Sequence, residues 1–166
     1  SYRTNSLVLE CSKSPIDFYE ELETIGSGAF GLVKKVRLKS NPDTIRAMKI
    51  ISKSNLLKGI NDANLIEEIY ILKNLDHPNI MKLYEFFDDG KHYYMITEYC
   101  DQDDLYAKLN KLYCMNQIVV KFLMGQILNA VSYLHSKGVF HGDIKLENIM
   151  LYSTTKNTKQ RFTMIN

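Results

Sequence analysis

The sequence reads His141-Gly142-Asp143-Ile144-Lys145-Leu146-Glu147-Asn148 between a long helical pattern and a short apolar run. Three of these residues supply different chemical groups: Asp143 a carboxylate, Lys145 an ammonium and Asn148 an amide. The carboxylate can orient or deprotonate an attacking hydroxyl, the ammonium can neutralise charge on a moving phosphoryl group, and the amide oxygen can hold a metal ion. Each residue alone is an ordinary polar loop residue. Together with two motifs nearer the N-terminus, they indicate phosphoryl transfer.

A long helix is expected before this stretch, with Lys137 in its last turn and Gly138 as its C-cap. Its apolar stripe consists of Ile118, Phe122, Leu123, Ile127, Val131 and Leu134. A shorter helix precedes it and is opened by Asp103 and Asp104, because acidic side chains are favoured at a helix N-terminus. Residues 139–166 predict a short strand, a polar loop, a strand at 149–152, a hydrophilic turn and a final strand at 162–165.

Residues 18–99 are strand-like and punctuated by turns. Three strands are expected at 18–25, 32–38 and 44–51, then a helix at 63–75, then two strands at 80–87 and 93–99. The Asp89-Gly90 dipeptide predicts a hairpin between the last two strands. Residues 1–17 have no clear period and predict an arm that packs weakly if at all. The pattern therefore gives a first lobe of five antiparallel strands and one helix.

A glycine-rich stretch, Gly26-Ser27-Gly28-Ala29-Phe30-Gly31, lies between the first two expected strands. In a dinucleotide-binding fold this spelling opens a helix, whereas here a strand follows. Glycines let a backbone come close to phosphates and present its N–H groups to them. Taken alone, the stretch is about equally typical of a plain hairpin turn and of a phosphate-binding loop.

Lys49 lies on the third expected strand, in Ala47-Met48-Lys49. Strand alternation places Ala47 and Lys49 on one face and Met48 on the other. A lone strand lysine is usually a solvated edge residue. A lysine turned inward needs a carboxylate partner, and the following helix offers Glu67 and Glu68. We expect Glu68 to be that partner, while Glu67 could be a surface acid.

These motifs resemble those of the eukaryotic protein kinases. GSGAFGLV is similar to the glycine-rich loop of that family, AMK to its lysine strand and HGDIKLEN to its catalytic loop. LDHPNI and MKLYEFF also resemble the family, most of all its calcium/calmodulin-dependent and calcium-dependent branch. The resemblance covers residues 18–165 and implies an α+β, bilobal fold. It implies an N-terminal arm at 1–17, an N-lobe with a five-stranded antiparallel sheet and a helix at 18–99, and the start of a mainly helical C-lobe at 100–166.

The resemblance also implies a role for each matching residue. Asp143 would be the catalytic carboxylate, Lys145 would touch the transferred phosphate and Asn148 would bind Mg²⁺. Lys49 would contact the phosphates of ATP and pair with Glu68, beneath a loop containing Gly26, Gly28 and Gly31. The remaining nucleotide contacts would come from Ile25, Val33, Ala47 and Met150 at the adenine, Thr97 as gatekeeper, Glu98 and Cys100 at the hinge, and Asp104 at the ribose. Lys145, two residues after Asp143, is the spelling associated with Ser/Thr acceptors on protein substrates.

Three positions depart from the family pattern. Gly142 replaces a common arginine that receives a phosphorylated activation loop, so activation is expected not to use that ion pair. Leu146 replaces a common proline. Asn166 aligns with the metal-binding aspartate of the family, and an amide chelates Mg²⁺ less well than a carboxylate. This last departure, with an exposed stripe on the long helix, predicts a fragment of a longer domain. It also leaves a pseudokinase or nucleotide-binding scaffold as an alternative, while His141-Gly142-Asp143 alone allows a small-molecule kinase.

Composition narrows the class of protein. The 166 residues are 45% hydrophobic and 24% charged, which predicts one compact globular unit. A net charge of +2 argues against a non-specific nucleic-acid binder. Three scattered cysteines indicate neither a disulfide framework nor a zinc site, and favour a cytoplasmic location. The sequence contains no run of 18 uninterrupted apolar residues, so it predicts no membrane span. The residues contain no EF-hand loop pattern, so calcium dependence cannot be read from them, and the resemblance leaves room for a calcium-responsive regulatory region outside this chain.

Overall fold

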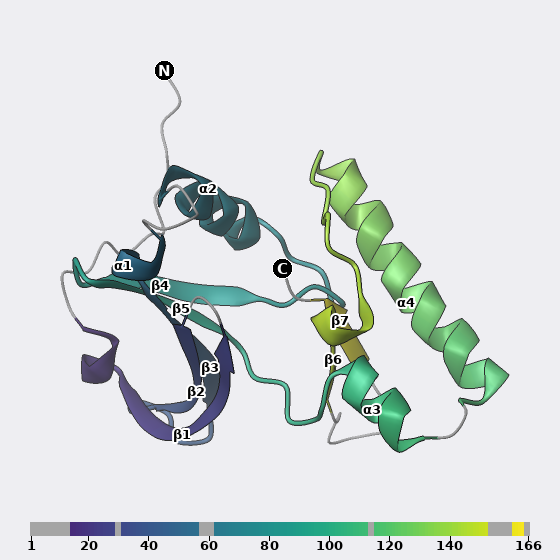
Figure 1. Ribbon diagram of the computed structural model, residues 1–166, viewed down its shortest axis with the longest axis horizontal. Coiled ribbons are helices and arrows are strands. Elements are labelled where there is room, and N and C mark those ends of the chain that lie inside the picture. The colour runs from purple at the N-terminus through teal and green to yellow at the C-terminus, as the bar shows by residue number, and fades with distance from the viewer. Residues whose placement is uncertain (1–13, 29–30, 57–61, 113–114, 153–160, 165–166) are drawn as a thin grey trace. The chain divides into compact units, whose positions relative to one another are not determined.

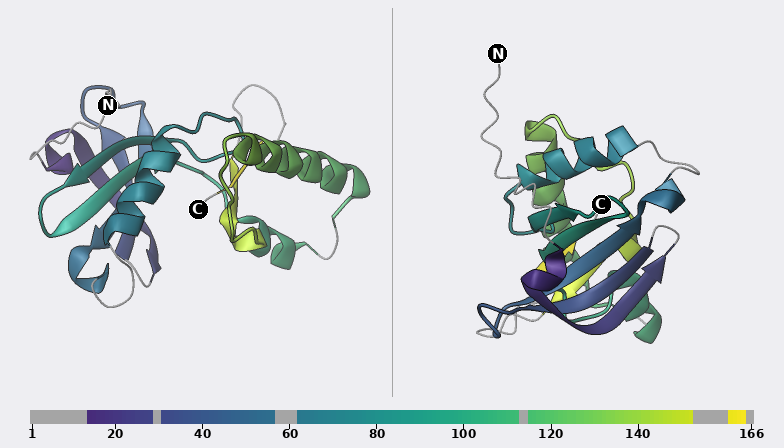
Figure 2. Two further views of the ribbon diagram at one scale, coloured as in Figure 1. Left: turned by 90° about the horizontal axis from the view of Figure 1, so that it is seen from above. Right: turned by 90° about the vertical axis from the view of Figure 1, so that its left-hand side faces the viewer.

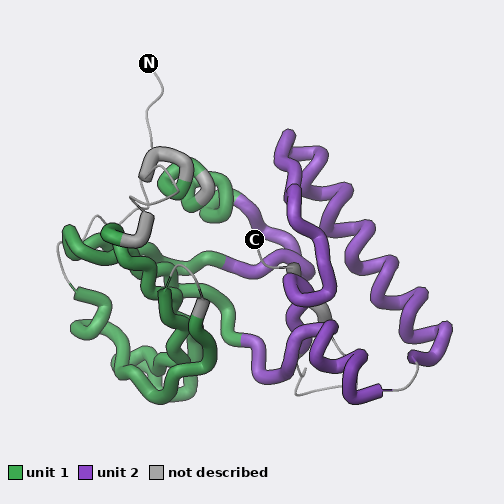
Figure 3. Tube along the Cα trace, viewed as in Figure 1, with its two compact units in different colours: residues 1–74, 83–99 green, residues 75–82, 100–166 purple. Residues whose placement is uncertain are grey.

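The computed structural model describes residues 14–28, 31–56, 62–112, 115–152 and 161–164. The chain forms two compact units (Figure 3). The first comprises Ser1–Asn74 and Leu83–Tyr99, and the second comprises Leu75–Lys82 and Cys100–Asn166. The sequence-based division assigns residues 75–82 to the first lobe, whereas here they cluster with the second unit.

The first unit is built on a five-stranded antiparallel sheet (Figure 1). Its strand order is β1-β2-β3-β5-β4, with bounds β1 Tyr19–Gly28, β2 Gly31–Leu38, β3 Ile45–Ser52, β4 Leu83–Asp88 and β5 His92–Glu98. Helix α2 (Asp62–Lys73) contacts β4, and the short helix α1 (Lys53–Leu56) contacts β3. The predicted α+β lobe of five antiparallel strands and a helix is confirmed.

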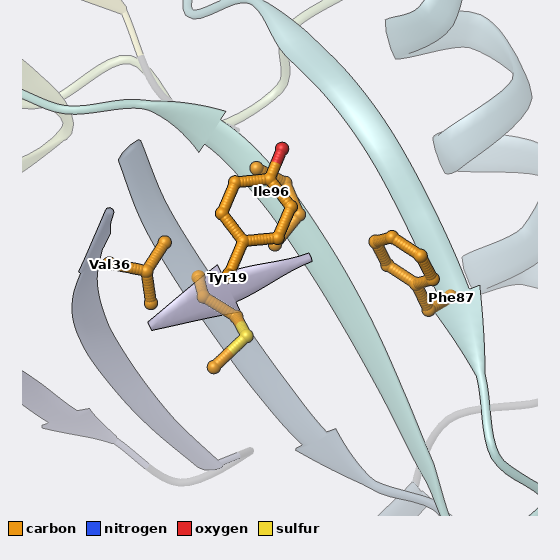
Figure 4. Close-up of a cluster of buried hydrophobic side chains, with 5 residues drawn as sticks. Tyr19, Val36, Phe87 and Ile96 are labelled. Atoms are coloured by element: carbon orange, nitrogen blue, oxygen red, sulfur yellow. The ribbon is translucent and has the colours of Figure 1, made fainter. Parts of the chain in front are cut away.

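One face of this sheet carries a closed apolar core (Figure 4). Its buried members are Tyr19, Val36, Met48, Phe87 and Ile96. Met48 lies opposite Ile96 across the β3–β5 pair, so both side chains point to the same face. Because strand residues alternate between faces, Ala47 and Lys49 point to the opposite face, as expected from the sequence.

The expected N-terminal arm is not wholly loose. Pro15–Asp17 forms a 3₁₀ turn, η1, in which the Pro15 side chain is buried. The ring of Phe18 stacks on that of Phe87 at a centroid distance of 5.9 Å. Pro15 is therefore attached to the folded unit, since a proline at the start of the turn can be buried without leaving an unpaired N–H, whereas Ile16 and Asp17 are exposed. Residues 1–13 lie outside the described part of the chain.

The second unit contains α3 (Leu105–Lys111), α4 (Gln117–Ser136), a 3₁₀ turn η2 (Leu146–Asn148) and a two-stranded ribbon. The ribbon pairs β6 (Ile149–Tyr152) with β7 (Arg161–Met164), and β7 contacts α4 (Figure 2). The short strand expected directly after the long helix does not form, since residues 139–145 are irregular. Side-chain hydrogen bonds within this stretch stabilise a loop in its place.

Helix α4 is as long as predicted, but its buried side differs from the predicted stripe. Leu123, Ala130 and Leu134 are buried, whereas Ile118 is 76% and Phe122 50% exposed. The helical period of a sequence predicts which side of a helix is apolar. It does not predict which of those apolar side chains are buried by other segments. By length and composition alone α4 could cross a membrane, although it contains no run of 18 uninterrupted apolar residues. The core helix of a water-exposed protein meets the same criterion.

The C-terminus of α4 follows the prediction closely. Gly138 has a φ of +72°, and its N–H donates to the carbonyl of His135. The N–H of Val139 donates to the carbonyl of Leu134. Glycine adopts this left-handed conformation at little cost, which ends the helix and turns the chain towards residues 141–148.

Candidate active site

Asp143, Lys145 and Asn148 come together in one loop of the second unit. The Lys145 ammonium lies 2.8 Å from Oδ2 of Asp143. The side-chain nitrogen of Asn148 donates to the same Oδ2 at 2.9 Å and to the backbone carbonyl of Asp143 at 2.8 Å. The three residues that the sequence associates with one reaction thus form one hydrogen-bonded cluster.

Local backbone geometry produces this cluster. Gly142 has a φ of +75°, a conformation that favours glycine, and open space surrounds the position of a Cβ there. The turn η2 then reverses the chain, with the N–H of Asn148 donating to the carbonyl of Lys145. Nδ1 of His141 accepts the N–H of Asp143 at 3.3 Å. No role for His141 was assigned from the sequence, although its spacing of two residues from Asp143 is typical of a local side-chain to backbone contact.

The cluster keeps Asp143 ionised. The hydrogen bond from Lys145 holds the pKa of the Asp143 carboxyl below its usual range, and the hydrogen bond from Asn148 acts in the same direction. The same contact raises the pKa of Lys145. Both side chains remain accessible, at 64% for Asp143 and 49% for Lys145. A charged, solvent-accessible carboxylate can accept a hydrogen bond from an incoming hydroxyl and orient it.

Asn148 leaves its amide oxygen available to a metal ion. Its nitrogen is committed to Asp143, so Oδ1 is the atom that can serve as a ligand. Mg²⁺ prefers oxygen ligands, and the amide oxygen of Asn148 is one. The chemistry of this oxygen therefore fits the Mg²⁺ that the sequence assigns to Asn148. In the part of the chain that the structure describes, no cluster of three or more His, Cys, Asp or Glu residues forms, and Asn166 lies outside that part.

Asp104 and Met150 lie side by side in the second unit. They form an isolated antiparallel bridge, although they are far apart in sequence. Oδ1 of Asp104 accepts the N–H of Ala107 at 2.7 Å, so this carboxylate is the N-cap of α3, as the sequence predicts. The capping contact leaves Oδ2 for the expected ribose contact. Cys100, expected at the hinge, is buried.

In the first unit, cross-strand pairing brings the predicted nucleotide residues onto one sheet face. Lys49 lies opposite Val33 on β2, and Ala47 lies opposite Thr97 on β5. Directly paired residues of antiparallel strands point to the same side, so these four side chains share the face opposite the apolar core. Ala47 is buried, and the others are partly buried.

The partner of Lys49 remains a prediction. Glu68 lies in α2, but its side chain is outside the described part of the structure. Among the side chains that are described, Lys49 makes no hydrogen bond or ion pair. Glu67, the weaker candidate, is exposed.

The glycine-rich stretch forms the β1–β2 hairpin. Gly26 pairs with Val33, and Gly28 pairs with Gly31. A Cβ on Gly31 would lie 1.8 Å from the carbonyl oxygen of Ile50, and its φ is +153°. Gly31 is thus required for the close approach of β2 to β3, whatever it does for a ligand. Ala29 and Phe30 lie outside the described residues.

The last predicted nucleotide residues, Ile25 and Glu98, lie on β1 and β5. Ile25 is 42% exposed on β1, where a side chain can contact a ligand. Glu98 ends β5 opposite Arg46, and its carbonyl accepts a long hydrogen bond of 3.4 Å from the Thr97 hydroxyl.

Comparisons with known proteins identify the family of the chain. A family model described as protein kinase domain matches residues 19–161. The 3-phosphoinositide-dependent protein kinase B of Dictyostelium discoideum is 42% identical over 84% of this chain and 15% of its own length. Calcium/calmodulin-dependent protein kinase type 1 of Macrobrachium nipponense is 36% identical over 86% of this chain and 41% of its own length. Calcium-dependent protein kinase 5 of Plasmodium falciparum is 37% identical over 86% of this chain and 24% of its own length. The chain thus spans less than half the length of each of these relatives.

Proposed function

The chain belongs to the protein kinase family, and on that premise we propose that it transfers the γ-phosphoryl group of ATP to serine or threonine hydroxyls of proteins. The observation that carries this proposal is the hydrogen-bonded cluster of Asp143, Lys145 and Asn148. Phosphoryl transfer needs positioned charges more than covalent chemistry, and this cluster supplies them in a short loop.

Each residue of the cluster has a defined part in the proposed reaction. The acceptor oxygen forms a bond to the γ-phosphorus, the bond from that phosphorus to the β–γ bridging oxygen breaks, and ADP leaves. The hydroxyl proton passes to Asp143, which is ionised and accessible. Lys145 neutralises charge on the transferred group. Asn148 fixes the carboxylate of Asp143 through its nitrogen and offers its oxygen to Mg²⁺, which would neutralise phosphate charge when bound.

Nucleotide binding is proposed for the sheet face of the first unit. Ala47, Val33 and Thr97 offer small or apolar surface for the adenine, and Lys49 on the same face offers an ammonium to the phosphates. The β1–β2 hairpin offers backbone N–H groups at Gly26 and Gly28. The assignment is supported by the shared face, which places groups of complementary chemistry side by side.

The acceptor and the regulation are finer proposals. Lys145 follows Asp143 by two residues, which favours Ser or Thr over Tyr. Two relatives carry calcium in their names and one carries 3-phosphoinositide, so the names alone favour neither form of regulation. Any calcium response would arise from a region outside these 166 residues. For the location of the protein, we propose the cytoplasm.

The pseudokinase alternative gains no support. It depends on Asn166, which lies outside the described residues, whereas the cluster around Asp143 is assembled. The small-molecule alternative is not favoured either, because the family model and the relatives above are named as protein kinases.

The test is phosphate transfer from radiolabelled ATP to a peptide library, followed by identification of the modified amino acid, with the full-length protein. We expect phosphoserine and phosphothreonine, and loss of both in Asp143→Asn. Glu147→Gln is the matched control, because Glu147 is an exposed carboxylate in the same loop. Phosphotyrosine as the main product would contradict the proposed acceptor.

A further inference from the structure

Lys35 has no role in the function proposed above, yet it joins three strands on the nucleotide face of the sheet. It pairs directly with Ala47, so its side chain lies on the same face as Ala47 and Lys49. Its ammonium lies 3.0 Å from Oε1 of Glu23 on β1 and 5.0 Å from the ring centroid of Tyr99, which directly follows β5. An ammonium within about 6 Å of an aromatic face is attracted to it.

The two contacts of Lys35 lie on opposite sides of its own strand. β1 neighbours β2 on one side, and β3 separates β2 from β5 on the other. The Lys35 ammonium and the Tyr99 ring therefore meet across β3, where the residue paired with Lys35 is Ala47. The side chain of Ala47 is only a methyl group, the smallest that an L-residue can place between them. Only 26% of the Lys35 side chain is exposed, so most of the side chain packs against the protein.

Near Glu23, the pairing of β1 with β2 is irregular, so a side-chain contact there can stabilise the strand. Its pairing with β2 shifts register between Glu21 and Glu23 and again between Thr24 and Gly26. Each shift inserts an extra residue and interrupts the backbone ladder. Glu23 and Thr24 are thus a short paired segment between two irregularities, immediately before Ile25 and the glycines. A side-chain bond at Glu23 holds this segment where the ladder is weakest.

The two ends of the contact lie next to residues predicted to touch the nucleotide base. Glu23 precedes Ile25 by two positions, and Tyr99 follows Glu98. The hydrogen bond to Glu23, and then the interaction with Tyr99, raise the pKa of Lys35, so both contacts favour the charged ammonium.

We propose that Lys35, held between Glu23 and Tyr99, is a positioning residue that sets the spacing between the glycine-rich hairpin and the end of β5, and thereby the affinity for the nucleotide base. This inference rests on the proposed function. Lys35 itself does not touch the reacting phosphate, so its loss acts on nucleotide binding and leaves the chemical step unchanged.

Lys34 provides a matched control. It is the neighbouring lysine on β2, and it makes an ion pair with Glu21 of β1 on the opposite face of the sheet. Both ion pairs join β1 to β2, but only the pair made by Lys35 lies on the face of Ala47 and reaches Tyr99.

The experiment measures steady-state kinetics and amide hydrogen exchange of the full-length protein. In Lys35→Met we expect the KM for ATP to rise roughly two- to fivefold at unchanged kcat, as the loss of one accessible charged contact implies. Lys35→Arg keeps the positive charge and should keep the wild-type KM. Tyr99→Leu should raise the KM as much as Lys35→Met does, and Lys34→Met should leave the KM unchanged. Exchange in residues 23–28 accelerates in Lys35→Met and in Glu23→Gln, a second variant that keeps the lysine stem.

The outcomes separate this inference from the proposed function. If wild type binds ATP and Lys35→Met changes neither the KM nor the exchange of residues 23–28, Lys35 is not a positioning residue, while the proposed function stands. Equal effects of Lys34→Met and Lys35→Met on the KM would also overturn the positioning role of Lys35. Any ion pair between β1 and β2 would then be enough to keep the wild-type affinity for ATP. If wild type neither binds ATP nor transfers phosphate, both proposals fall.

Discussion

Asn148 holds Asp143 through two hydrogen bonds from one nitrogen, to Oδ2 at 2.9 Å and to the backbone carbonyl at 2.8 Å. The amide assigned to metal binding therefore also fixes the carboxylate assigned to proton transfer. The two roles are coupled within a single turn of chain.

This coupling predicts a defect in Asn148→Ala beyond the loss of a metal ligand. Without the amide nitrogen, the Asp143 carboxylate loses its orientation, and we expect kcat to fall roughly 10- to 100-fold, as misplacement of a catalytic group does. Excess Mg²⁺ should not restore the rate. Asn110→Ala removes an exposed asparagine of α3 and serves as the control in the same assay. Full rescue by Mg²⁺ would show that Asn148 acts on the metal alone.

The pH dependence of the reaction should reflect the Asp143–Lys145 contact. Because Lys145 holds the pKa of Asp143 below its usual value of about 3.8, the carboxylate stays ionised to lower pH than a free aspartate. Lys145→Met removes that contact, so the pKa of Asp143 rises and the acid limb of kcat/KM moves to higher pH. Carboxyl-carbon NMR of Asp143 measures the same shift directly. An acid limb that does not move in Lys145→Met would contradict the assignment of Asp143 as the titrating base.

Gly31 and Gly26 should respond differently to alanine. In Gly31→Ala the new Cβ meets the carbonyl of Ile50 at 1.8 Å, so β2 must move away from β3 and we expect a loss of roughly 1–3 kcal/mol in the free energy of unfolding. In Gly26→Ala the Cβ meets Val33 at 3.7 Å, an ordinary contact, and stability should hardly change. Urea denaturation of both variants checks this. Equal destabilisation would mean that the hairpin itself, not its approach to β3, requires the glycines.

Asp89 should contribute to stability in a defined pH window. Partial burial opposes ionisation, but hydrogen bonds from the Tyr94 hydroxyl and from the N–H groups of His92 and Lys91 lower the pKa of Asp89 to about 2. A depressed carboxyl pKa stabilises the fold above the unfolded value of about 3.8, and that stability is lost as the pH falls towards 2. Asp89→Asn should therefore lower the free energy of unfolding at pH 7 and make less difference at pH 3.

Asp43→Asn, at an exposed turn position, is the control for this comparison. A difference between wild type and Asp89→Asn that stays the same from pH 7 to pH 3 would show that the stabilisation by Asp89 does not depend on its charge.

Local patterns predicted the parts of the molecule that depend on local spacing. The alternation of Ala47, Met48 and Lys49 gave the correct faces of β3, and Gly138 gave the end of α4. Interactions between segments that are distant in the sequence could not be predicted from local patterns. The contact of Lys35 with Tyr99 depends on strand order, which spacing along the chain does not encode. The exposure of Phe122 likewise depends on what packs against α4, not on the helical period.

The most direct test of the central claim separates nucleotide binding from transfer in two variants of the full-length protein. ATP affinity and phosphate transfer to a serine peptide are measured for wild type, Lys49→Met and Asp143→Asn. We expect Asp143→Asn to bind ATP like wild type and to lose roughly 10²- to 10⁴-fold in transfer rate, as removal of a general base does, while Lys49→Met loses affinity for the phosphates. Unchanged transfer in Asp143→Asn would contradict the account.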